Sequence, residues 1–194
     1  MSGKRLFDVI LSVILIIVLS PLFLLIALMI KIEDGGKIFF SQERIGISGK
    51  PFQIYKFRTM SLDAEKDGPI LSPDSEDCDA RISKTGRFLR AHHLDELPQL
   101  WNVLIGDMSF VGHRPERKYF IDQIMEQDSR YSRLYSIRPG ITSYATLFNG
   151  YTDTMEKMLK RLEYDLDYLD NNSLRIDLGI LWKTFIFTIS GKQF

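Results

Sequence analysis

Two adjacent carboxylates, Asp95 and Glu96, are the most informative chemical feature of the sequence. They stand where a helix is expected to begin, and Arg90 precedes them by a few residues. A helix N-terminus and nearby arginines attract anions, and carboxylates together with phosphate oxygens bind a hard cation such as Mg²⁺. The pair therefore suits a site for a divalent metal and a phosphate. On local evidence alone a structural role is simpler, with Asp95 as N-cap and Glu96 facing the helix dipole.

Positively charged side chains recur on separate segments that could meet this pair. They are Lys56 and Arg58 on an expected strand, Arg90 in a basic stretch that starts at Arg81, Arg114 with Pro115 in a tight turn, and Arg138 before Pro139 and Gly140. Arginine in such turns suits a phosphate or a carboxylate. A solvated, charged surface explains each segment separately, so their convergence on one anionic ligand is a hypothesis about the tertiary structure.

The elements that must position these residues begin with a hairpin. Segments 38–40 and 52–57 are rich in β-branched and aromatic residues, and they flank a glycine-containing turn at 46–50. This pattern predicts a β-hairpin that carries Lys56. The turn has Pro51 where a phosphate-binding loop needs Ser or Thr, so it is not interpreted as one. Residues 61–79 are polar and acidic with Pro and Gly, which is typical of a mobile surface loop.

Residues 94–104 predict the helix that should carry the carboxylates, with Pro98 in its first turn and Gly106 at its end. Its expected buried stripe is Leu97, Leu100, Trp101 and Leu104. Further helices are expected at 119–135 and 155–169. The apolar segment 176–189 is too short to span a bilayer, so it is either a core helix or an interfacial helix.

Composition excludes several classes of function. The chain has 194 residues, enough for one domain with a core, and 25 Lys plus Arg balance 25 Asp plus Glu. Bulk nucleic-acid binding needs a basic excess, so no nucleic-acid partner is expected. The single cysteine, Cys78, excludes a disulfide framework and argues against a zinc site built from several thiolates.

The N-terminal segment predicts attachment to a membrane. The apolar run 6–30 carries one charge, Asp8, and as a helix it could cross the ~30 Å hydrocarbon core. Ser20 and Pro21 interrupt the run, and proline removes a backbone donor, so a kink is expected with Ser20 as the local hydroxyl partner. Basic residues flank both ends, at Lys4 and Arg5 and again at Lys31 and Lys37. The residues alone leave open a kinked span and a re-entrant hairpin.

The order of motifs resembles a known family over nearly the whole chain. The matching pieces are KRLFD at 4–8, Ser20-Pro21, QERIG at 42–46, KFRTM at 56–60, GRFLR at 86–90, DELPQLWNV at 95–103, GDMSFVG at 106–112, Arg114-Pro115, RPGIT at 138–142, and Asp165, Tyr168, Asn171, Ser173-Leu174 and Asp177-Leu178. The chain is thereby identified as similar to the bacterial sugar transferases of the small monotopic phosphoglycosyl transferase type, which start glycan assembly on polyprenol phosphate.

The resemblance implies an α+β fold in two parts. Residues 1–34 would form a re-entrant helix-break-helix, broken at Ser20 and Pro21, that stays in one leaflet. Residues 35–194 would form a mostly helical cytoplasmic catalytic domain with a small β-hairpin and amphipathic interfacial helices. The implied location is the cytoplasmic face of the bacterial inner membrane, in contact with membrane lipid, and a homodimer is compatible with it.

The resemblance also implies a reaction. Asp95 would attack the sugar-bearing phosphorus of a UDP-sugar and displace UMP, and polyprenol (undecaprenol) phosphate would take the phospho-sugar from the aspartyl intermediate. Asp95 would also bind Mg²⁺, and Glu96 would take the acceptor's proton or help to place the metal. The implied substrate-binding residues are Lys56, Arg58, Arg90, Arg114, Pro115, Arg138 and Asp165. The product would start a capsule, exopolysaccharide, O-antigen or glycoprotein glycan, which downstream glycosyltransferases extend.

Three residues depart from the family pattern. His113 stands where the family usually has proline, Ser143 where it has glycine, and Thr146 where it has glutamine. These positions lie beside expected substrate loops, so they leave the sugar open without touching Asp95. The alternative hypothesis is a membrane-anchored adaptor that binds anionic lipid or nucleotide through its cationic turns and catalyses nothing.

Overall fold

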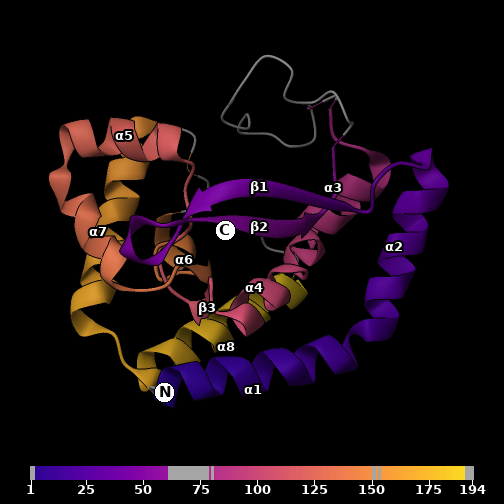
Figure 1. Ribbon diagram of the computed structural model, residues 1–194, viewed down its shortest axis with the longest axis horizontal. Coiled ribbons are helices and arrows are strands. Elements are labelled where there is room, and N and C mark those ends of the chain that lie inside the picture. The colour runs from indigo at the N-terminus through magenta and orange to yellow at the C-terminus, as the bar shows by residue number, and fades with distance from the viewer. Residues whose placement is uncertain (1–2, 61–78, 80, 150–151, 153, 191–194) are drawn as a thin grey trace.

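The computed structural model describes residues 3–60, 79, 81–149, 152 and 154–190 (Figure 1). Nearly all of the surface loop expected at 61–79 lies outside the described residues. Within them the protein is a helix-dominated α+β fold with two small sheets, β1–β2 and β3–β4, which agrees with the expected fold class.

The N-terminal apolar run forms two helices, α1 (Gly3–Val18) and α2 (Ser20–Asp34), with a bend of 60° between them. Pro21 has no N–H to donate to the carbonyl of Ile17, one turn earlier. The hydroxyl of Ser20 donates to that carbonyl instead, at 2.8 Å, as the sequence predicted. The bend therefore follows from local backbone chemistry.

No single helix among the described residues has both the length and the apolar composition to cross a bilayer. The bent pair α1–α2 satisfies both criteria only when its two helices are taken together. A broken span and a re-entrant loop are both compatible with this geometry.

The bent pair is packed against the remainder of the chain. Buried Asp8 on α1 accepts the backbone N–H of Phe110 at 3.2 Å, and Lys4 forms an ion pair with Asp177. On α2, Ile26 and Ile30 join the buried cluster that contains Phe57 and Leu89. The two helices thus share a core and polar contacts with the elements that follow.

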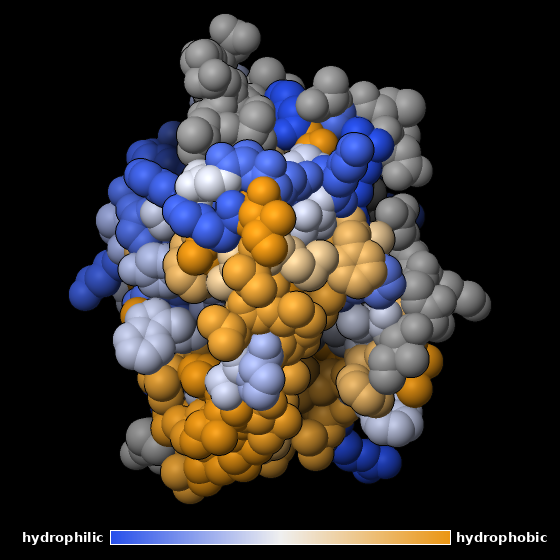
Figure 2. Space-filling view, turned by 90° about the vertical axis from the view of Figure 1, so that its right-hand side faces the viewer, coloured by the Kyte–Doolittle hydropathy of each residue, from blue (hydrophilic) through white to orange (hydrophobic). Residues whose placement is uncertain are grey.

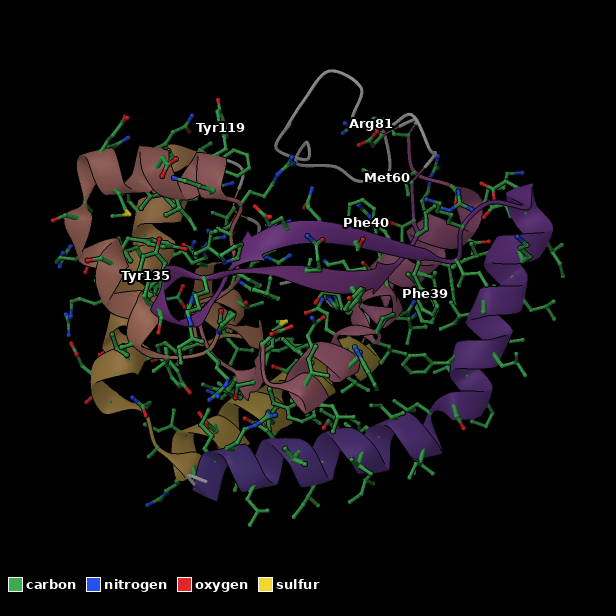
Figure 3. All side chains as sticks on the ribbon, viewed as in Figure 1. Phe39, Phe40, Met60, Arg81, Tyr119 and Tyr135 are labelled. Atoms are coloured by element: carbon green, nitrogen blue, oxygen red, sulfur yellow. The ribbon has the colours of Figure 1, made fainter. Side chains whose placement is uncertain are left out.

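The expected hairpin is present as β1 (Phe39–Ile45) and β2 (Pro51–Phe57), which pair antiparallel with Phe39 opposite Phe57. The 3₁₀ turn η1 (Ile47–Gly49) joins them. Phe39 and Phe40 extend to opposite sides of β1 (Figure 3), and the Phe39 ring stacks on that of Phe57 with centroids 5.4 Å apart. This contact lies at the end of the hairpin near α2.

The region expected as one helix at 94–104 is divided. A helix α3 (Lys84–Ala91) is followed by the 3₁₀ turn η3 (Leu94–Glu96) and then by α4 (Gln99–Ile105). Asp95 lies inside η3, so the prediction that it is the N-cap was wrong; Pro98 occupies that position of α4. The expected burial of Trp101 was also wrong, because its exposed fraction is 53% while Asn102 is fully buried.

Short strands β3 (Ser109–Val111) and β4 (Gly140–Thr142) form a parallel pair that the sequence did not predict. The segment expected to be one helix at 119–135 is divided into the helix α5 (Lys118–Gln127) and the 3₁₀ segment η4 (Ser129–Ser136). Asp128 separates them, because it adopts an extended conformation and its carboxylate accepts the N–H of Arg130 at 2.9 Å.

The C-terminal helices are α6 (Thr146–Asn149), α7 (Met155–Asn171) and α8 (Leu174–Ser190), and α7 agrees with the predicted helix. Apolar side chains are exposed on three long helices. They include Leu6, Ile10, Ile14 and Ile17 on α1, Leu24, Leu25, Leu28 and Ile32 on α2, and Leu178, Trp182, Phe185 and Ile186 on α8. Figure 2 shows such side chains gathered over the lower part of the face on which α2 lies.

Candidate active site

The two carboxylates occupy the tight turn η3 between α3 and α4. His93, with φ 53° in the left-handed region, directs the chain from α3 into this turn. Asp95 has an exposed fraction of 7%, and the Glu96 side chain has one of 15%. Burying two adjacent carboxylates is costly unless cations or hydrogen-bond donors surround them.

Three cationic side chains from three segments surround the pair. From β2, Lys56 Nζ lies 2.6 Å from Glu96 Oε1, and from the turn after β3, Arg114 Nη2 lies 3.7 Å from the same oxygen. Arg90 on α3 acts electrostatically on Asp95, and its Nε donates to Thr59 Oγ1 at 3.0 Å. The structure therefore brings together Lys56, Arg90 and Arg114 around the carboxylates, although they are far apart in sequence.

The two carboxyl groups have opposite pKa shifts. Burial raises the pKa of Asp95, and the adjacent negative charge of Glu96 adds to that rise against the opposing effects of Lys56 and Arg90. Burial also penalises ionised Glu96, but Lys56 and Arg114 outweigh it and hold its pKa below the ordinary value. Glu96 is thus the fixed negative charge of the site. Asp95 is the more basic carboxylate, and within the described residues it forms no ion pair.

Close backbone packing positions Arg90. A Cβ atom added to Gly86 on α3 would collide with the carbonyl of Thr59, so only glycine permits this approach. The contact brings α3 against the chain just beyond β2, where Thr59 receives the hydrogen bond from Arg90.

A buried amide joins α4 to β2. Asn102 donates through Nδ2 to the carbonyl of Gln53 at 2.7 Å and accepts the N–H of Tyr55 through Oδ1 at 3.0 Å. These two bonds fix Lys56, the next residue on β2, relative to η3. Nothing in the sequence indicated this role for Asn102 beyond its place in the motif at 95–103 and beside the apolar stripe of the predicted helix.

Arg58 and Arg138 have partners elsewhere. Arg58 binds the Asp34 carboxylate and donates to the carbonyl of Lys37 at 2.5 Å, so it joins the end of β2 to the end of α2. This contact holds the pKa of Asp34 at about 2. Arg138 donates through Nε to the carbonyl of Gly106 at 2.7 Å. Three of the four cationic segments therefore contribute a side chain beside the carboxylates, through Lys56, Arg90 and Arg114. Their convergence on an anionic ligand stays a prediction.

Asp165 belongs to a second buried polar cluster. Arg161 Nη2 and Glu116 Oε1 are 2.8 Å apart, and Arg44 Nη1 lies 3.6 Å from Glu116 Oε2. Burial raises the pKa of Asp165 to about 7 against the opposing charge of Arg161, and burial lowers the pKa of His113 to about 4. Arg44 also donates to the carbonyl of Pro115 at 3.2 Å. This cluster supports the turn that carries Arg114.

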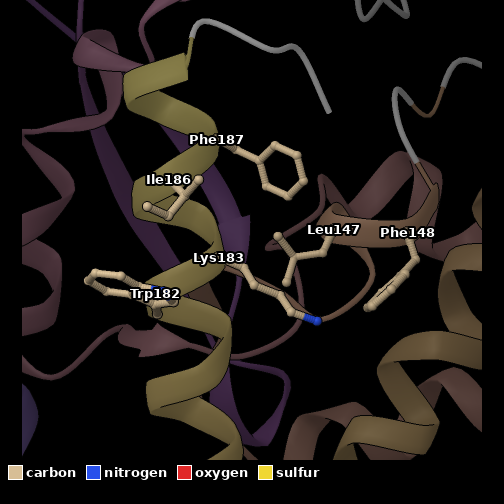
Figure 4. Close-up of a pocket in the computed structure, with 6 residues that line it drawn as sticks. All are labelled: Leu147, Phe148, Trp182, Lys183, Ile186 and Phe187. Carbon is tan, nitrogen blue, oxygen red and sulfur yellow. The ribbon is translucent and has the colours of Figure 1, made fainter.

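An apolar hollow of about 360 Å³ lies between α6 and α8 (Figure 4). It is lined by Leu147, Phe148, Trp182, Lys183, Ile186 and Phe187. The Nζ of Lys183 lies 5.3 Å from the centroid of the Phe148 ring. Because none of these residues carries a carboxylate, the hollow offers no counterpart to the chemistry of Asp95 and Glu96.

The chain is similar to known proteins over nearly its whole length. The family model for bacterial sugar transferases matches residues 1–191. A UDP-glucose:undecaprenyl-phosphate glucose-1-phosphate transferase of Klebsiella pneumoniae is 42% identical over 95% of this chain and 39% of its own length. The protein of the same name from Caulobacter vibrioides is 43% identical over 93% of this chain and 67% of its own.

A UDP-N-acetylgalactosamine-undecaprenyl-phosphate N-acetylgalactosaminephosphotransferase of Aeromonas hydrophila is 38% identical over 97% of this chain and 44% of its own length. The chain thus spans about two fifths of the Klebsiella and Aeromonas proteins. The match over nearly all of its residues shows that the chain belongs to the bacterial sugar transferase family.

Proposed function

We propose that the protein transfers a phospho-sugar from a UDP-sugar to undecaprenol phosphate and releases UMP. The observation that carries this proposal is the buried Asp95–Glu96 pair enclosed by Lys56, Arg90 and Arg114. A nucleophilic carboxylate beside several fixed cations suits attack on a diphosphate, because the cations offset the repulsion between the two anions. The relatives that carry names of this reaction agree with it.

In the first step an Asp95 carboxylate oxygen forms a bond to the sugar-bearing phosphorus, and the bond from that phosphorus to the oxygen of UMP breaks. The leaving UMP takes the electron pair, and Arg90 and Arg114 are suited to stabilise its charge. In the second step a phosphate oxygen of the lipid acceptor attacks the same phosphorus and releases the Asp95 carboxylate. The product is a polyprenol diphosphate sugar.

The raised pKa of Asp95 supports its role as nucleophile, because a more basic oxygen is a stronger nucleophile once ionised. The lowered pKa of Glu96 makes it a poor proton acceptor, so its proposed role is to keep Lys56 and Arg114 in place and to help hold the metal. Among the described residues no group of three or more His, Cys, Asp or Glu could hold a metal.

The donor set at η3 nevertheless fits Mg²⁺, which commonly takes one or two carboxylates and completes its coordination with substrate phosphates and water. Asp95 is the carboxylate without an ion pair among the described residues, so it is the proposed protein ligand, with Glu96 beside it. When bound, the ion would supply positive charge to the diphosphate.

We further propose that α1 and α2 form a re-entrant hairpin at the cytoplasmic face of the bacterial inner membrane. The 60° bend, the basic residues at both ends and the exposed apolar faces of α1, α2 and α8 support this location. Such a hairpin would hold the catalytic turn near the headgroups, where a lipid-linked phosphate lies.

The test is a UMP-release assay with UDP-glucose, UDP-galactose and UDP-N-acetylgalactosamine in the presence of undecaprenol phosphate. Asp95→Asn should abolish UMP release and the trapping of a radiolabelled phospho-sugar on the protein. Asp122→Asn, an exposed carboxylate on α5, is the matched control and should retain activity. Release of UDP instead of UMP, or full activity of Asp95→Asn, would refute the mechanism. Absence of nucleotide release from the wild-type protein would favour the adaptor hypothesis.

A further inference from the structure

A polar cavity is lined by residues of α1, of the segments around β3 and β4, and of the connection from α7 to α8, and neither Asp95 nor Glu96 lines it. Figure 1 shows the N-terminal end of α1 beside this connection. Its volume is about 170 Å³. Lys4, Arg5 and Arg138 contribute positive charge to its wall, and Asp8 is the one carboxylate among its lining residues. The cavity is thus basic and small enough to fit a compact anion.

Both arginines of the cavity wall donate hydrogen bonds to the end of α4 and the turn after it. Arg5 donates to the carbonyls of Val103 and Leu104 at 2.5 and 2.8 Å, at the end of α4. Arg138 donates through Nε to the carbonyl of Gly106 in the turn that follows. Neighbouring guanidinium groups repel each other, and an anion between or beside them would relieve that repulsion.

Two donors in the cavity wall have capacity that the described residues do not use. The Nε of Arg138 has a partner, but its two Nη groups have none among the described residues. The Ser109 hydroxyl is buried, with an exposed fraction of 1%, and also lacks a partner there. A buried hydroxyl without a hydrogen bond is costly, so Ser109 in the wall of a basic cavity favours the binding of an anionic acceptor there.

The other polar groups nearby are already engaged. Lys4 Nζ donates to the carbonyl of Val111 at 3.0 Å, to the Tyr168 hydroxyl at 3.1 Å and to Asp177. The Asp8 carboxylate accepts the N–H of Phe110. Asp177 therefore offsets the charge of Lys4, while Arg138 and Ser109 supply donors that no other described residue occupies.

We propose that this cavity binds a phosphate group, with the Arg138 guanidinium and the Ser109 hydroxyl as its donors. An arginine that is fixed through Nε and presents two Nη groups matches the bidentate geometry of phosphate oxygens. The group could belong to a membrane lipid or be free phosphate. The exposed apolar residues Leu6 and Ile10, on the first turns of α1, favour a lipid whose chains lie along that helix.

The experiment measures the thermal unfolding midpoint of the whole chain in non-ionic detergent micelles. Inorganic phosphate is added at constant ionic strength, adjusted with chloride, and short-chain phosphatidylglycerol is added in a parallel series. For wild type we expect the midpoint to rise by about 3–5 °C when the ligand is ~10-fold above its Kd. A rise with both ligands identifies a general phosphate site, and a rise with the lipid alone identifies a headgroup site.

Arg138→Gln and Ser109→Ala should each remove most of the rise. Arg133→Gln is the matched control, because Arg133 is an exposed arginine of η4 that pairs with Asp170. If Arg138→Gln does not fold, Ser109→Ala still decides the question, since its hydroxyl has no protein partner to lose among the described residues. Absence of a rise in wild type, or an equal loss in Arg133→Gln, would overturn the proposal. UMP release reports on Asp95, so the two proposals can fail separately.

Discussion

The ammonium group of Lys56 lies 2.6 Å from Oε1 of Glu96, and this ion pair ties the β1–β2 hairpin to the turn that holds both carboxylates. The two side chains are 20% and 15% exposed, so water screens the pair only in part. Lys56 therefore has two effects at once: it keeps Glu96 ionised, and it places positive charge beside Asp95.

Replacement of Lys56 should affect both stability and activity. In Lys56→Met, Glu96 loses its nearest cation while Arg114 remains at 3.7 Å, so we expect the free energy of unfolding to fall by about 2–3 kcal/mol. UMP release should fall as well, because one cation beside the carboxylates is lost. Lys118→Met removes an exposed lysine from an i,i+4 pair that solvent screens, so it should leave stability nearly unchanged. Urea unfolding of both variants measures the difference, and equal values would contradict the assigned role of Lys56.

A methyl group at Gly86 should displace α3. The new Cβ of Gly86→Ala would overlap the carbonyl of Thr59, so α3 must move and carry Arg90 with it. We expect a loss of about 1–3 kcal/mol in stability and a lower rate of UMP release.

The matched control is Gly179→Ala, at a helical position of α8 where the added Cβ meets nothing within 4 Å. Alanine has the higher helix propensity, so this variant should be more stable by up to about 1 kcal/mol. Opposite signs in thermal unfolding are the expected result. A neutral Gly86→Ala would show that the contact with Thr59 does not constrain α3.

The buried Asp165 and His113 should have opposing effects on the pH dependence of stability. The pKa of Asp165 is raised from 3.8 to about 7, so its contribution is complete below pH 3.8 and is lost as pH rises toward 7. The pKa of His113 is lowered from 6.5 to about 4, so its contribution is complete above pH 6.5 and is lost as pH falls toward 4. Between pH 4 and 6.5 the two contributions to the free energy of unfolding change with pH in opposite directions and cancel.

Asp165→Asn should reveal the pH dependence of the free energy of unfolding that comes from His113. The free energy of unfolding is then expected to rise with pH between 4.5 and 6 by up to ~1.4 kcal/mol per unit, relative to wild type. Urea midpoints at several pH values measure this slope. Asp167→Asn, an exposed neighbour on α7, is the control and should keep the wild-type profile. A wild-type profile in Asp165→Asn would show that the carboxyl group titrates normally.

The bend at Pro21 should determine membrane topology. In a Cys78→Ser background, Gly3→Cys and Lys37→Cys flank the two helices and should both react with an impermeant thiol reagent from the cytoplasmic side. Pro21→Ala restores a backbone donor for the carbonyl of Ile17, so α1 and α2 can continue as one helix. In that variant a fraction of the molecules should expose position 3 or 37 on the opposite side. Opposite labelling in the Pro21-containing protein would favour a plain span.

The sequence alone predicted the features that depend on residues close together in the chain. The break at Ser20–Pro21, the hairpin and α7 depend on residues close together in the chain: a missing N–H, a glycine turn between β-rich segments, and a helical repeat of apolar residues. The motif order also indicated the family, since it matches the known proteins over nearly the whole chain. Interactions between chain neighbours are encoded directly in residue type and spacing.

The site itself required the tertiary structure. Lys56 and Arg58 are two residues apart, yet one binds Glu96 and the other Asp34, because η3 and α2 approach different parts of the same segment. Trp101 was expected to be buried and is exposed, whereas Asn102 is buried because it binds backbone groups of the neighbouring strand β2. Such outcomes depend on which distant element supplies a charge or a hydrogen bond, and helical periodicity contains no information about that partner.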